Sequence, residues 1–66
     1  MTLAERMVQY RAKERLTQAE FAQKCGLSGQ TITTVERGIQ TPSRVTVAKI
    51  ELVIGKENDG IINNED

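Results

Sequence analysis

Four closely spaced helix-start signals divide this sequence into short helical segments. Thr2 and Thr17 are each followed three residues later by a glutamate, which is the spacing of a capping box. Ser28 and Ser43 supply simpler caps further along the chain. The breaks between segments are short, and the sequence shows no strand pattern or internal repeat. We therefore predict a compact all-α domain, with helices at about 3–15, 18–25, 28–37 and 44–54.

The chain is too short for more than one small hydrophobic core. It has 66 residues, a single cysteine and no histidine, which excludes an internal disulfide and any Cys/His metal cluster. We expect Cys25 to be a small buried apolar residue, and we expect no cofactor or metal. Self-association is a reasonable expectation for a domain without such staples. No signal peptide or membrane-length apolar run is present, so we expect a soluble cytoplasmic protein without a membrane partner.

The zero net charge conceals an uneven distribution along the chain. Residues 1–50 contain eight basic and four acidic side chains, a net charge of +4, whereas residues 51–66 carry −4. Two interpretations stay open: an ordinary solvated surface, or a body that binds a polyanion while its acidic end points away. We predict that 1–55 form the folded domain. Residues 56–66 would be an acidic tail, which Ile61 and Ile62 could dock on the folded domain.

The segment around Gly26 has the features of two helices joined by a sharp turn. Glycine adopts the positive φ that such a turn requires at little cost. Ala22 is small enough for a close helix crossing, and Ile32 and Val35 would face back into that crossing. This arrangement describes a helix-turn-helix, whose second helix is held outward for a DNA groove.

The stretch TQAEFAQKCGLSGQTITTVERG, residues 17–38, resembles the helix-turn-helix of lambda-repressor-like, Cro/repressor-type bacterial and phage regulators. The resemblance extends over about residues 3–55 and implies a bundle of four or five helices. The fifth helix usual in the family has no clear counterpart in 57–66. The matched positions are Thr17, Gln18, Ala22, Gly26, Leu27, Ser28, Ile32, Val35, Glu36, Gly38, Pro42 and Ser43.

A glutamate on the apolar side of the third predicted helix needs a partner. The resemblance implies that Glu36 pairs, largely buried, with Arg11 on the first helix. The residue types agree, because a carboxylate placed among apolar side chains must find a cation or become protonated. The alternative is that Glu36 turns out to solvent.

The opposite face of the third helix carries amides and hydroxyls where an ordinary exposed helix would carry charges. Glutamine can donate to and accept from adenine, and threonine offers a hydroxyl and a methyl group. A bare glycine lets the helix end approach DNA closely. We predict base contacts from Gly29, Gln30, Thr33 and Thr34. We predict phosphate contacts from Gln18, Ser28, Thr31, Arg37, Gln40 and Arg44.

The fourth predicted helix is apolar on two sides, although a small domain offers it one core. Val47, Ile50 and Ile54 form the first stripe. The second stripe, roughly opposite, is a predicted dimer surface, for which the protein's own tail is the alternative cover. Its candidate residues are Val45, Ala48 and Leu52, with Ile61 and Ile62 as additional cover.

These observations predict a sequence-specific regulator of transcription, a repressor that reads a two-fold operator in double-stranded DNA as a homodimer. It would be either a minimal Cro-like regulator or the DNA-binding part of a longer repressor. No small-molecule effector is evident, and no nucleophile–base pair, metal set or phosphate loop suggests an enzyme. Two alternatives share the fold: an antitoxin or restriction–modification controller, and a protein-interaction module that has lost DNA binding.

Overall fold

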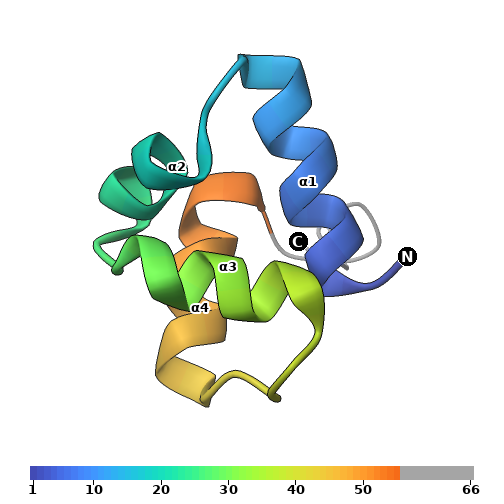
Figure 1. The fold of residues 1–66 in the computed structure, drawn as a ribbon, viewed down its shortest axis with the longest axis vertical. Helices are drawn as coiled ribbons and strands as arrows, with labels where there is room; N and C mark the ends of the chain where they lie inside the picture. Colours follow the sequence, from blue (N-terminus) through green and yellow to red (C-terminus); the bar gives the residue numbers. More distant parts are fainter. Residues whose placement is uncertain (56–66) are drawn as a thin grey trace, which may run out of the picture.

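Four helices make up the part of the chain that the structure, a computed structural model, describes, which is residues 1–55 (Figure 1). They are α1 (Leu3–Glu14), α2 (Gln18–Cys25), α3 (Gly29–Arg37) and α4 (Arg44–Ile54). The predicted all-α fold is confirmed, and each helix begins directly after its predicted cap. The predicted tail, with Ile61 and Ile62, lies outside the described residues.

The four caps fall into two kinds. Thr2 and Thr17 form complete capping boxes at the starts of α1 and α2, and each box places a glutamate in the first helical turn. In the first box the backbone N–H of Thr2 donates to the Glu5 carboxylate, which lowers the pKa of that carboxyl. Ser28 and Ser43 cap α3 and α4 without any acidic residue in the first turn. The positive ends of α3 and α4 are therefore not neutralised by a carboxylate of their own.

A single core of seven apolar side chains joins the helices. Every helix contributes to it, and four of the side chains are completely shielded from solvent. The ring of Tyr10 on α1 also packs against Phe21 on α2, with 5.8 Å between ring centroids. The core residues are Met7, Phe21, Ala22, Cys25, Ile32, Val35 and Ile50.

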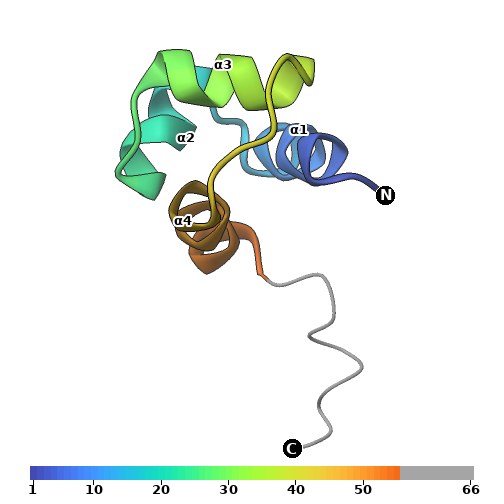
Figure 2. The same cartoon turned by 90° about the horizontal axis from the view of Figure 1, so that it is seen from below.

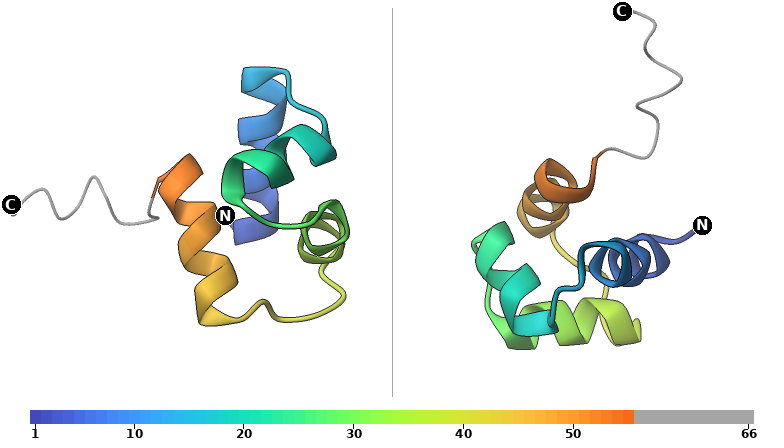
Figure 3. Two further views of the ribbon diagram at one scale, coloured as in Figure 1. Left: turned by 90° about the vertical axis from the view of Figure 1, so that its left-hand side faces the viewer. Right: turned by 90° about the horizontal axis from the view of Figure 1, so that it is seen from above.

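The helices are arranged so that α3 lies at the outer edge of the molecule. Figure 2 shows α3 on one side and α4 on the other, with α1 and α2 between them. The views in Figure 3 show the same order, and the connection between α3 and α4 crosses from one side to the other. Only the underside of α3 is therefore covered by the other helices.

The turn between α2 and α3 depends on a left-handed glycine. Gly26 has a φ of 72° and ends α2, where its N–H donates to the carbonyl groups of Ala22 and Gln23. The next residue, Leu27, is half-buried and packs against the core. Ser28 then starts α3 at once. This short, anchored connection fixes the direction in which α3 leaves α2.

Candidate nucleic-acid interface

The two sides of α3 have opposite character. Ile32 and Val35 are buried and attach the helix to the core. Gln30 and Arg37 are exposed on the outer side, while Gly29, Thr33 and Thr34 are partly exposed beside them. The predicted base-contacting residues therefore share one outward face, called the α3 face from here on: Gly29, Gln30, Thr33 and Thr34.

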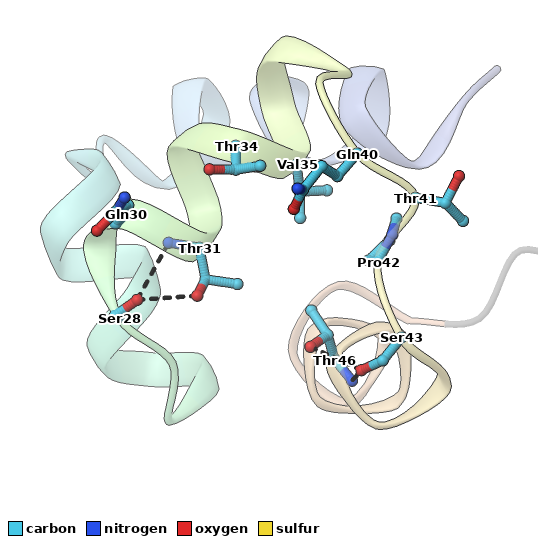
Figure 4. Close-up of a pocket in the computed structure, with 10 residues that line it drawn as sticks. All are labelled: Ser28, Gln30, Thr31, Thr34, Val35, Gln40, Thr41, Pro42, Ser43 and Thr46. Atoms are coloured by element: carbon cyan, nitrogen blue, oxygen red, sulfur yellow. Dashed lines mark hydrogen bonds between the residues drawn. The ribbon is translucent and has the colours of Figure 1, made fainter.

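An open groove of about 330 Å³ runs beside the α3 face, between α3 and the start of α4 (Figure 4). Its two ends carry the matching caps of α3 and α4, in which the cap hydroxyl also bonds a threonine hydroxyl one turn later. These hydroxyl pairs are Ser28 with Thr31, at 2.8 Å, and Ser43 with Thr46, at 3.1 Å. No charged side chain lines the groove, whose residues are Ser28, Gln30, Thr31, Thr34, Val35, Gln40, Thr41, Pro42, Ser43 and Thr46.

Three of the residues predicted to contact phosphate lie at the end of α3, in the connection that follows and at the start of α4. Arg37 is the last residue of α3, Gln40 lies in the connection, and Arg44 is the first residue of α4. All three are exposed, and within residues 1–55 neither arginine takes part in an ion pair. The charges of Arg37 and Arg44 are therefore not neutralised by a carboxylate within these residues.

Arg11 and Glu36 are brought together by the packing of α1 against α3. The guanidinium donates from Nε to Oε2 at 2.8 Å and from Nη2 to Oε1 at 2.9 Å, so the pair is bidentate. Its third donor, Nη1, reaches the carbonyl of Leu16 at 3.1 Å. The Glu36 side chain is only 5 % exposed, and its hydrogen bond raises the pKa of Arg11. The end of α3 is thus fixed to α1.

Gln18 has contacts that the sequence did not reveal. Its side-chain nitrogen donates to Glu36 Oε1 at 2.9 Å, and its side-chain oxygen accepts a hydrogen bond from Thr33 Oγ1 at 2.8 Å. The sequence predicts that Gln18 contacts a phosphate and that Thr33 contacts a base, and it indicates no contact between the two residues. Both residues also belong to one chain of hydrogen bonds that runs from Arg11 through Glu36 and Gln18 to Thr33 on the α3 face. Spacing in the sequence does not predict this chain of hydrogen bonds, because the chain depends on how three helices are placed relative to one another.

The second apolar stripe of α4 has no cover within residues 1–55. Leu52 is 85 % exposed and Val45 is 64 % exposed, and Ala48 lies exposed between them. Ile50, in contrast, is completely buried on the other side of the same helix. The α4 stripe (Val45, Ala48 and Leu52) is therefore an apolar surface on the outside of the folded part.

Comparison with known proteins agrees with this geometry. The model of the family described as Helix-turn-helix matches residues 7–57. This chain belongs to the helix-turn-helix family. The predicted lambda-repressor-like resemblance and fold class are confirmed. An uncharacterized HTH-type transcriptional regulator of Methanocaldococcus jannaschii is 40 % identical over 57 residues, which cover 86 % of each chain. No solved structure matches the chain.

Across 1–55, no helix has the length and apolar character needed to cross a membrane. The same part of the chain holds no group of three or more His, Cys, Asp or Glu side chains that could bind a metal ion. Its lone cysteine, Cys25, is buried among the core residues, and burial raises the pKa of its thiol.

Proposed function

We propose that this helix-turn-helix protein is a DNA-binding regulator of transcription, and that it represses by occupying a two-fold operator as a homodimer. The observation that carries the proposal is the α3 face, an outward surface of uncharged hydrogen-bonding groups held from behind by Ile32 and Val35. The family and the similar regulator support DNA binding and transcriptional control. On this proposal the protein catalyses no reaction and acts in the cytoplasm, where its DNA lies.

Residues in the first two turns of α3 contact the bases. Gln30 is exposed there, and its amide matches the N6 and N7 atoms of adenine in the major groove. Thr33 and Thr34 follow on the same face. A Cβ atom added to Gly29 would meet nothing within 4 Å in the protein, and its φ is not positive, so the fold itself does not require glycine there. We attribute the glycine at position 29 to the close approach of a ligand outside the chain.

Phosphate binding falls to the groove and its surroundings. The N-termini of α3 and α4 both border the groove and carry no carboxylate in their first turns, so their positive ends favour an anion. Ser28, Thr31 and Gln40 supply neutral donors, while Arg37 and Arg44 supply charge. Gln18 retains a second amide hydrogen for a phosphate after its bond to Glu36.

Dimerisation falls to the α4 stripe. A two-fold pair of helix-turn-helix domains places its two recognition helices in successive major grooves, so a symmetric operator requires a symmetric protein contact. Exposed Leu52 and Val45 provide the apolar surface for such a contact. We also propose that residues 1–55 form the DNA-binding domain and that 56–66 form an acidic tail, which Ile61 and Ile62 could bring to the same contact.

Base and phosphate contacts can be separated by salt dependence. Gln30→Ala should weaken binding to the preferred site by about 1–3 kcal/mol and relax preference at one position per half-site, with little change in salt slope.

Arg44→Ala should weaken binding to all sequences and reduce the salt slope by about one per subunit, because one ion pair is lost. Titrations at several salt concentrations, on preferred and base-substituted duplexes, measure both effects. A Gln30 variant with altered salt slope and unaltered base preference would place the recognition face elsewhere on α3.

Selection of bound sites from random duplex DNA tests the function as a whole. We expect enrichment of a two-fold consensus whose half-sites are about one helical turn apart. A consensus without two-fold symmetry would contradict the homodimer while leaving DNA binding intact. No enrichment would contradict DNA recognition itself and favour a protein-interaction module with the same fold.

A further inference from the structure

Arg11 and Gln18 both form hydrogen bonds to Glu36, and the chemistry of the three side chains determines which atom donates in each bond. A guanidinium can only donate, and the Glu36 carboxylate accepts from Arg11 at both of its oxygens. A carboxylate in such a pair has no proton to give. The Gln18 atom that lies 2.9 Å from Oε1 must therefore be the amide nitrogen, since the amide oxygen would face another acceptor.

The orientation of Gln18 then decides what Thr33 does. With its nitrogen on Glu36, Gln18 turns its carbonyl oxygen to Thr33, 2.8 Å away. A carbonyl oxygen can only accept, so the Thr33 hydroxyl donates its one proton to Gln18. A hydroxyl has one proton and two lone pairs. Thr33 is left with acceptor capacity alone for any ligand that reaches it.

Glu36, which orients Gln18, is shielded from solvent, whereas Thr33 is accessible to a ligand. The Glu36 side chain is 5 % exposed, so solvent does not compete for the carboxylate that orients Gln18. Thr33 is partly exposed on the α3 face. Its neighbour Thr34 is also partly exposed, but none of the hydrogen bonds between side chains in residues 1–55 involves the Thr34 hydroxyl. Thr34 can therefore rotate to donate or to accept, and it serves as an internal comparison.

We propose that Gln18 is a positioning residue for base specificity, because it makes Thr33 an acceptor-only reader of the major groove. The inference rests on the proposed DNA-binding function and names a preference within it. In the major groove adenine presents the N6 amino group and cytosine the N4 amino group, while guanine and thymine present only acceptors as polar groups. A base that hydrogen-bonds to the Thr33 hydroxyl is accordingly adenine or cytosine. Thr34 imposes no such restriction through its hydroxyl.

The test is a selection from random duplex DNA with four proteins: wild type, Gln18→Leu, Thr33→Val and the double variant. Thr33→Val identifies the position that Thr33 reads, because the preference there is lost with the hydroxyl. At that position wild type should favour adenine or cytosine by about fivefold. Gln18→Leu releases the hydroxyl proton, so guanine and thymine become acceptable and the preference should fall to within about twofold. In the Thr33→Val background, Gln18→Leu should change the preference at that position no further.

Two additional variants separate this role from a general structural one. Thr33→Ser keeps the hydroxyl and should keep the preference for adenine or cytosine. Thr34→Val should leave that position unaltered. Circular dichroism reports whether Gln18→Leu folds; if it does not, the comparison of Thr33→Ser with Thr33→Val still decides whether the hydroxyl accepts from an amino group.

Three results would overturn the inference while the proposed function stands. Wild type could favour guanine or thymine at the Thr33 position, folded Gln18→Leu could retain the full wild-type preference, or Thr33→Val could alter no position at all. Failure of the proposed function has a different signature, which is that wild type enriches no sequence. That result would remove the inference as well.

Discussion

Replacing Glu36 with alanine is expected to leave much of the protein unfolded near room temperature. The substitution strands the Arg11 guanidinium, which loses two of its hydrogen bonds, and removes the acceptor of the Gln18 amide. Breaking a fully buried pair costs about 3–5 kcal/mol. Glu36 is 5 % exposed and Arg11 20 %, so the loss should approach that range. Small domains are stable by an amount at the low end of roughly 5–15 kcal/mol, so the loss removes most of the stability. Chemical denaturation followed by circular dichroism measures it.

A matched carboxylate on α1 provides the control for Glu36→Ala. Glu14 is exposed, and Glu14→Ala should change the free energy of unfolding by less than about 0.5 kcal/mol. Replacing both Arg11 and Glu36 with leucine should give a more stable protein than Glu36→Ala alone, because no charge is then left without a partner. A Glu36→Ala unfolding curve close to that of wild type would show that the pair contributes little to the fold.

Leu52→Glu should convert a dimer into a monomer and reduce affinity for a two-half-site operator by about 100-fold. The physical reason is that a linked second domain binds its half-site at a high effective concentration, an advantage that a monomer loses. Leu52 is 85 % exposed and takes no part in the core, so the helical content should not change. Analytical ultracentrifugation and titration of the operator measure association and affinity separately.

The control for Leu52→Glu is a similar change on another helix. Val8 on α1 is 44 % exposed, and Val8→Glu should leave both association and operator affinity unchanged. Affinity for a single half-site should also be the same in the Leu52 variant and in wild type. Identical sedimentation of wild type and Leu52→Glu, with and without DNA, would show that the α4 stripe is not the dimer contact.

Local signals were sufficient to predict the helices. Each N-terminus depends on a cap and on residues within the next turn, such as Thr17 with Glu20, and this information is contiguous in the sequence. The alternation of buried and exposed positions on α3 follows from helical periodicity in the same way. Gly26 also marked the turn, because a left-handed helix end favours glycine.

Features that depend on several helices at once were not predictable from spacing. The bond between Gln18 and Thr33 requires α2 and α3 to cross at a particular distance, which no local pattern encodes. The end of α1 was hard to predict for a different reason. Arg15 adopts a left-handed φ of 58°, a conformation usually taken by glycine. Because the residue there is arginine, the sequence contained no glycine signal for the end of the helix. Arg6 of α1 also donates to the carbonyl of Gly55 at the end of α4, another contact between distant segments.

An NMR titration of the labelled protein with its selected duplex tests the central claim, that the α3 face reads DNA. We expect the largest changes in amide chemical shift, and the strongest protection from hydrogen exchange, in residues 29–37 and in the groove residues Gln40, Thr41, Ser43 and Thr46. The outer side of α1 around Val8 should change little. Changes concentrated on α1, with α3 unaffected, would contradict the account.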